Sequence, residues 1–158
     1  MKNSARFIIS IAMPQVVGFS AALITNKYIN GYFNQQLIKP GWNPPGYLFG
    51  PVWTTLYVLM GIALYKIWKS DASKPVKTQS IVLWSIQMFF NFWWSIIYFK
   101  EQDIGLALID ICLLWLTILL TIFSFARISK TAAWLLVPYI SWVSFAAYLN
   151  YTIWTLNG

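Results

Sequence analysis

Five long apolar segments, separated by short stretches that hold most of the charged residues, dominate the pattern of this 158-residue chain. A helix that crosses the hydrocarbon core of a bilayer needs roughly 20 predominantly apolar residues, and each segment is long enough. The apolar runs show no period-two alternation, so helices are predicted rather than the strands of a barrel. We predict an all-α integral membrane protein, a single five-transmembrane-helix bundle over residues 1–158, with spans at about 7–26, 48–68, 78–99, 104–126 and 132–156.

The connection between the first two spans has a composition of its own. Residues 37–53 contain four of the seven prolines, three of the eight glycines and two of the ten tryptophans. Proline fixes φ, removes a backbone donor and pushes the preceding residue towards an extended conformation, so no helix is expected over 39–46. Pro51 is compatible with the first turn of a helix that begins near Leu48. We predict a rigid, aromatic outer loop over 27–47, long enough to fold over the mouth of a cavity.

Composition supports the membrane assignment and gives an orientation. Only 9% of the residues are charged, against about 25% in soluble domains. The basic residues are spread among the connections instead of clustered, which argues against a nucleic-acid partner and leaves membrane lipid as the surroundings. Eight of them fall on the N-terminal side of the membrane and three (Lys27, Lys39 and Lys100) on the other. The positive-inside rule then predicts a cytoplasmic N-terminus and an outer C-terminus, and we expect a bacterial inner membrane.

Several kinds of chemistry are absent from the sequence. It has no histidine and a single cysteine, Cys112 within an apolar run, so we expect neither a metal site nor a disulfide. No phosphate-binding glycine loop or Ser-His-Asp set is present, and no cofactor is expected to be required. Asp110 is the only ionisable side chain well inside a span. We interpret it as a cap or loop partner near the outer interface in preference to a proton relay.

Polar and aromatic residues recur at helical spacing on two of the predicted spans. Gln87, Asn91, Trp94 with Ser95, and Tyr98 form one such face, and Tyr139, Trp142, Ala146 and Asn150 form another, with Pro138 expected to kink its start. These faces either hydrogen-bond neighbouring helices or line a cavity. A cavity of this composition suits a flat, hydrophobic ligand that stacks on indoles and accepts a few hydrogen bonds.

Four motifs in order give the chain a family resemblance. They are K-P-G-W-N-P-P at 39–45 with F-G-P-V-W at 49–53, Gln87…Asn91…Trp94, G-L-A-L-I-D at 105–110, and P-Y…W…F-A…L-N-Y within 138–151. Together they resemble the TspO/MBR family, which comprises the tryptophan-rich sensory proteins and translocator proteins formerly called peripheral benzodiazepine receptors. The resemblance extends over essentially the whole chain.

The resemblance implies a five-helix bundle, usually a homodimer, that binds porphyrins and haem as ligands. The family's ligand-facing positions carry over onto Trp53, Asn91, Trp142 and Ala146, and we add four neighbours to the expected ligand-binding set: Pro44, Pro45, Phe49 and Leu114. Two departures affect specificity. The family's proposed sterol motif needs a basic residue soon after Tyr151, and none follows, so cholesterol is a poor candidate. Leu106 stands where many members have tryptophan.

Three functions stay open from the sequence. The first is a membrane receptor or sensor, or a transporter, for tetrapyrroles and similar lipophiles. The second is light- and oxygen-dependent porphyrin degradation, for which the resemblance makes Trp53 and Trp142 the candidate catalytic residues. The third is a structural or regulatory membrane subunit without a ligand. Substitution of the two tryptophans separates these functions, because each predicts a different combination of binding, product and stability changes.

Overall fold

The computed structural model describes all 158 residues and is entirely helical. Five helical segments are long and apolar enough to cross a membrane, as predicted. They comprise α1 (Asn3–Tyr28) with its π-helical continuation η1 (Ile29–Gln36), the 3₁₀ turn η2 (Gly46–Leu48) with α2 (Phe49–Trp68), α3 (Lys74–Ser95) with the π-helical η3 (Ile96–Lys100), α4 (Ile104–Ala126), and α5 (Lys130–Leu135) followed by α6 (Val137–Asn157).

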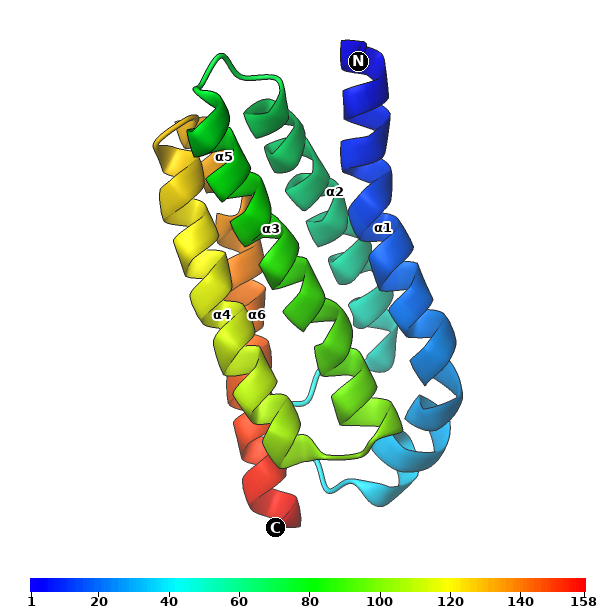
Figure 1. Cartoon of the computed structure of the whole chain (residues 1–158). Coiled ribbons are helices and arrows are strands. Elements are labelled where there is room, and N and C mark those ends of the chain that lie inside the picture. The colour runs from blue at the N-terminus through cyan, green and yellow to red at the C-terminus, as the bar shows by residue number, and fades with distance from the viewer.

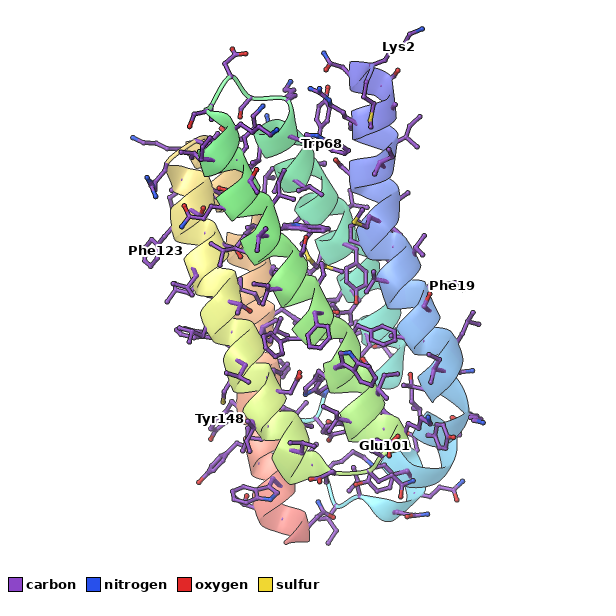
Figure 2. The ribbon with its side chains drawn as sticks, viewed as in Figure 1. Lys2, Phe19, Trp68, Glu101, Phe123 and Tyr148 are labelled. Carbon is purple, nitrogen blue, oxygen red and sulfur yellow. The ribbon has the colours of Figure 1, made fainter.

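The helices form one bundle with the termini at opposite ends (Figure 1). Helix α1 packs mainly against α2 at one edge, while α4 packs against both α3 and α6 at the other. We call the end that contains residues 37–45 and the C-terminus the loop end. Phe19, Phe123 and Tyr148 project outward from the bundle (Figure 2), and all three are exposed. Large apolar side chains on the outside of a bundle are expected where the surrounding solvent is lipid.

The predicted first span and the predicted loop over 27–47 are wrong in their boundary. Helix α1 begins at Asn3 and continues without interruption through η1 to Gln36, which leaves only 37–45 as irregular chain. Tertiary packing explains the extension. Tyr32 is buried in an apolar cluster at the loop end, and its hydroxyl donates a hydrogen bond of 3.2 Å to the carbonyl oxygen of Gln102. The proline argument is confirmed over 39–45, whereas Gly46, the last residue of the predicted range 39–46, opens the 3₁₀ turn η2.

The other spans agree with the prediction more closely. The fourth coincides with α4, α2 begins one residue after Leu48, and the third extends a few residues further at the N-terminal end than expected. The fifth divides at Leu136 into α5 and α6, with Pro138 in the first turn of α6. The predicted kink at Pro138 is therefore a break between two helices, and the missing N–H of proline leaves no helical partner unsatisfied there.

Two contacts hold α1 close to α2. An added Cβ at Gly61 would lie 2.6 Å from the carbonyl oxygen of Ser10 and 2.8 Å from the Cα of Ile11, both backbone atoms. An added Cβ at Gly18 would overlap the ring of Tyr57. Both glycines are needed because the helices approach too closely for a larger residue.

Candidate functional site

A cavity of about 520 Å³ lies in the half of the bundle nearer the loop end. All five spans contribute to it, through α1 with η1, η2 with α2, α3 with η3, α4 and α6. No charged residue is among its 28 lining residues, and 17 of them are hydrophobic. Volume and composition are those of a site for a mostly apolar small molecule, oriented by a few uncharged polar groups.

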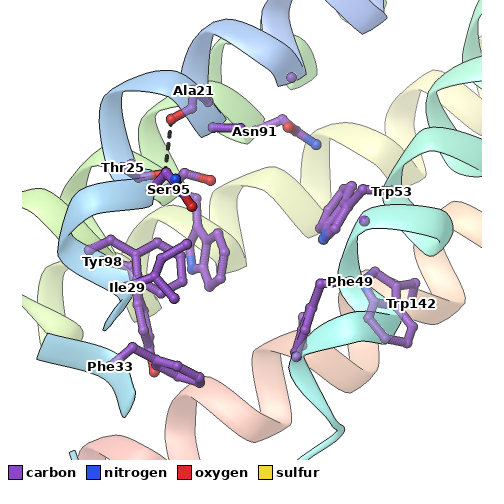
Figure 3. Close-up of a pocket in the computed structure, with 18 of the residues that line it drawn as sticks. Ala21, Thr25, Ile29, Phe33, Phe49, Trp53, Asn91, Ser95, Tyr98 and Trp142 are labelled. Atoms are coloured by element: carbon purple, nitrogen blue, oxygen red, sulfur yellow. Dashed lines mark hydrogen bonds between the residues drawn. The ribbon is translucent and has the colours of Figure 1, made fainter. Parts of the chain in front are cut away.

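Aromatic side chains form two facing walls (Figure 3). Phe49, Trp53 and Trp142 lie on one side, and Phe33 and Tyr98 on the other. The rings of Phe49 and Trp142 meet edge to face with centroids 6.0 Å apart, and those of Trp53 and Tyr57 lie 5.6 Å apart. Packed aromatic pairs of this kind hold one another in place, so the walls are defined before any ligand arrives.

Six of the eight predicted ligand-binding residues line this cavity: Trp53, Asn91, Trp142, Ala146, Phe49 and Leu114. Pro44 and Pro45 do not line it. Pro45 instead precedes the 3₁₀ turn η2, so the two prolines shape the entry into α2. The sequence therefore identified helices that form the cavity, but it did not show which residues of the loop line it.

Residues 27–47 contribute to the cavity, but as part of its wall and not as the loop over its mouth that we predicted. Its lining residues are Ile29, Phe33 and Asn34, which are helical, and Gly46, which opens η2. Residues 37–45 do not line this cavity, and Trp42 among them packs against the outside of α6. There Trp42 stacks on Tyr148 with centroids 5.5 Å apart, and it meets Phe145 edge to face at 5.9 Å. Because Phe145 lines the cavity, the loop supports this wall from behind.

A chain of hydrogen bonds runs inward from the cavity. Tyr57 donates its hydroxyl to Asn91 Oδ1 at 3.0 Å, Asn91 Nδ2 donates to the hydroxyl of Tyr139 at 2.8 Å, and Tyr139 donates to Gln87 Oε1 at 2.6 Å. Gln87, which the sequence left between packing and ligand binding, is thus an interhelical partner and does not line the cavity. Asn91 has both roles, because it also lines the cavity. Its amide retains one N–H and one lone pair for a ligand.

A second amide ties three helices together beside the cavity. Trp94 Nε1 donates to Asn150 Oδ1 at 3.0 Å, and Asn150 Nδ2 donates to the carbonyl oxygen of Ile104 at 3.1 Å. Asn150 of α6 therefore joins α3 to the start of α4. Both Trp94 and Asn150 line the cavity, so the predicted polar faces of the third and fifth spans do meet.

Six buried side-chain polar atoms have no hydrogen-bond partner within the protein, and two of them belong to residues singled out from the sequence. One is the indole nitrogen of Trp142, a donor on a residue that lines the cavity. The other is Oδ2 of Asp110, which lies more than one turn into α4. The interpretation of Asp110 as a cap is wrong, since Asp103 caps α4 by accepting a hydrogen bond of 2.9 Å from the Leu106 N–H. Asp110 does not line the cavity.

Four lining residues of the first span were not among the predicted ligand-binding residues. Ala21, Thr25, Ile29 and Phe33 all line the cavity from α1 and η1. Their spacing of four residues was a usable signal, but the polar composition of 27–36 concealed its continuation. The structure has no group of three or more His, Cys, Asp or Glu side chains placed to hold a metal ion.

Comparisons with known proteins agree along the whole length of the chain. The sequence profile of the TspO/MBR family matches residues 10–155. A tryptophan-rich protein TspO from Chlorobaculum tepidum is 46% identical over 156 residues, which cover 99% of this chain and 98% of that protein. One from Archaeoglobus fulgidus is 35% identical over 99% of each chain. The translocator protein of Sus scrofa is 34% identical over 92% of this chain and 86% of its own.

Proposed function

This chain belongs to the TspO/MBR family of integral membrane proteins, and on that premise we propose that it is a membrane receptor or sensor for porphyrins, haem and similar flat lipophiles. The ligand occupies the aromatic cavity between the helices. Transport of the same molecules would use the same cavity. Trp53 and Trp142 stack on the macrocycle, and Asn91 hydrogen-bonds to it.

One observation carries this proposal: six residues chosen from the sequence line a single uncharged cavity of about 520 Å³ with aromatic walls. A porphyrin presents two wide π-faces, which are suited to stacking on indole and phenyl rings. The partnerless N–H of Trp142 adds support, because a buried donor gains free energy when a ligand supplies its acceptor. The remaining N–H and lone pair of Asn91 offer a second polar contact.

The test is a tryptophan-quenching titration with protoporphyrin IX in phosphatidylcholine nanodiscs in the dark. We expect saturable quenching, and we expect the Trp53→Phe/Trp142→Phe variant to bind about tenfold more weakly, because two stacking surfaces shrink and a donor is lost. The matched control is Trp134→Phe/Trp154→Phe, which also removes two indoles but from exposed positions outside the cavity. Equal affinity in all three proteins would contradict the proposal and leave partition into the bilayer as the cause of quenching.

A second candidate is degradation of the bound porphyrin in light and oxygen. It is favoured by the presence of both Trp53 and Trp142 in the lining of one cavity, where each indole is within reach of the same macrocycle. Illumination of the complex then removes the porphyrin absorption band. If single Trp→Phe variants retain binding but stop this loss, the indoles take part in the chemistry.

The third function, a structural or regulatory subunit without a ligand, predicts that the same substitutions alter stability or self-association and leave no saturable binding to change.

Two further features, the oligomeric state and the membrane location, belong to the proposal. The chain forms a homodimer, as the family resemblance implies. It lies in a bacterial inner membrane with its N-terminus in the cytoplasm, which the distribution of eight basic residues against three supports.

A further inference from the structure

The cavity is open on one side of the bundle. Seven of its lining residues are exposed, and they are Phe19, Ala22, Asn26 and Asn34 of α1 and η1, and Gly46, Gly50 and Thr54 of η2 and α2. The lining residues from α3, η3, α4 and α6 are all buried or half-buried. The opening therefore lies between α1 and α2, on the side of the bundle and not at its end.

The limits of this opening are well defined. Towards the N-terminal end it stops where Gly18 packs on Tyr57 and where Gln15 Nε2 donates a hydrogen bond of 3.1 Å to the carbonyl oxygen of Thr54. Towards the loop end, the connection 37–45 is held against α6 and the end of the chain. The side-chain amide of Asn157 brackets the backbone of Ile38 there, accepting from its N–H at 2.9 Å and donating to its carbonyl oxygen at 2.8 Å.

Two glycines keep the α2 edge of the opening free of side chains. Gly46 and Gly50 lie four residues apart and both line the cavity, and an added Cβ at either would meet nothing within 4 Å. This contrasts with Gly18 and Gly61, where a Cβ would overlap the neighbouring helix. The first pair therefore borders open space, whereas the second pair allows close packing.

The position of the opening along the bilayer normal indicates which part of the lipid it faces. Lys27 is the only charged residue of α1 near its loop end, and a lysine there marks the headgroup region. Phe19 precedes it by eight residues, about 12 Å along the helix axis, so the Phe19 and Ala22 part of the rim lies at the level of the acyl chains. The rest of the α1 rim consists of Asn26 and Asn34, which are amides near or beyond the level of Lys27.

We propose that the opening between α1 and α2 is a lateral portal, through which the ligand passes directly between the bilayer and the cavity. The ligand class is a flat amphiphile, whose apolar body crosses the acyl-level part of the rim while its polar groups follow the asparagines. This inference rests on the proposed function, because it needs a ligand that occupies the cavity. It assigns to Gly46 and Gly50 the role of keeping the portal wide.

The portal predicts that obstruction changes rates more than affinity. Stopped-flow quenching with protoporphyrin IX in phosphatidylcholine vesicles compares the parent chain with Gly50→Phe, which adds a ring at the α2 edge, and Ala22→Phe, which adds one at the α1 edge. Both variants should slow association and dissociation together by about tenfold, with the equilibrium constant preserved within about threefold. Gly41→Phe and Leu23→Phe are matched controls at exposed positions that do not line the cavity, and their rates should equal those of the parent.

A second arm identifies the source of the ligand. In the parent chain, the association rate should follow the porphyrin-to-lipid ratio and stay constant when vesicles of one ratio are diluted. A rate that follows the aqueous concentration overturns the portal. So do unchanged rates in both Phe variants with binding intact, or weaker affinity with unchanged association, which would make these residues part of the binding surface. If the parent chain shows no saturable binding, the proposed function itself fails, and the portal fails with it.

Discussion

At the scale of single residues, Tyr139 is the side chain that links the buried amides to the aromatic wall of the cavity. It is fully buried, accepts from Asn91 and donates to Gln87, and it also meets the ring of Trp53 edge to face at 6.3 Å. The same residue therefore orders an amide that lines the cavity and an indole that forms one wall. Tyr139 thus orders the cavity wall although it does not line the cavity itself.

Tyr139→Phe should destabilise the protein by about 1–3 kcal/mol, because it leaves the Asn91 N–H and the Gln87 carbonyl without partners in a buried site. Thermal unfolding in detergent measures this as a lower midpoint. Tyr148→Phe is the matched control, since Tyr148 is exposed and its hydroxyl makes no hydrogen bond within the protein, while its stacking on Trp42 would be kept. Equal midpoints for the two variants would show that the hydroxyl of Tyr139 contributes nothing.

The sequence patterns predicted which residues line the cavity better than they predicted which residues these side chains contact. Asn91, Trp142 and Ala146 follow helical spacing, and helical spacing alone determines which face a residue occupies. Asp110 shows the limit of this reasoning, because a cap is defined by its distance from the helix end, and α4 begins at Ile104. Whether a helix face meets another helix or a cavity depends on how the helices pack together, which the spacing within one helix does not specify.

At the scale of elements, α1 is the least firmly packed span. Only Ser10, Pro14, Ala21 and Thr25 of its 26 residues are buried. Its attachment to the bundle depends on close approach to α2 at Gly61 and Gly18, where small residues let the helices touch. The boundary of this helix could not be predicted, since residues 29–36 have the polar composition of a loop and become helical through contacts such as that of Tyr32 with Gln102.

Gly61→Ala should separate α1 from α2 and destabilise the bundle by about 1–3 kcal/mol, because the new methyl group would press on the backbone of Ser10 and Ile11. Backbone atoms cannot turn aside as a flexible side chain can. Gly41→Ala, where nothing lies within 4 Å of the new Cβ, should leave stability within about 0.5 kcal/mol of the parent. The check is a pair of unfolding curves in the same detergent, and indistinguishable curves would contradict the tight contact.

At the scale of the whole molecule, the number and order of the spans were predictable because a bilayer permits so few alternatives. A backbone in hydrocarbon must satisfy its own hydrogen bonds, so long apolar segments become helices. The side of the bundle on which the cavity opens was not predictable, since it follows from how the connection 37–45 packs on α6. Trp42 and Asn157 fix that arrangement, and they are 115 residues apart in sequence.

The orientation in the membrane can be tested with single cysteines in a Cys112→Ser background. Gly41→Cys places a thiol in the connection 37–45, and Ala72→Cys places one between α2 and α3 at the opposite end of the bundle. We expect a membrane-impermeant maleimide to label the first in intact cells and the second only after lysis, because the basic residues favour the cytoplasmic side. The reverse pattern would show that the N-terminus lies outside.

The hydrogen bonds that link Tyr57, Asn91, Tyr139 and Gln87 can run in either of two donor-to-acceptor directions. Each of the four side chains carries both a donor and an acceptor, so a flip of both amides, which exchanges their oxygen and nitrogen, and a rotation of both hydroxyl protons would reverse all three hydrogen bonds without moving the side chains elsewhere. In one direction the Tyr57 hydroxyl donates a hydrogen bond to Asn91, and in the other it accepts one from Asn91, which leaves its own O–H free to donate elsewhere. We therefore expect that a ligand of the cavity can meet Tyr57 with either a donor or an acceptor atom, because the chain of hydrogen bonds can run in either direction.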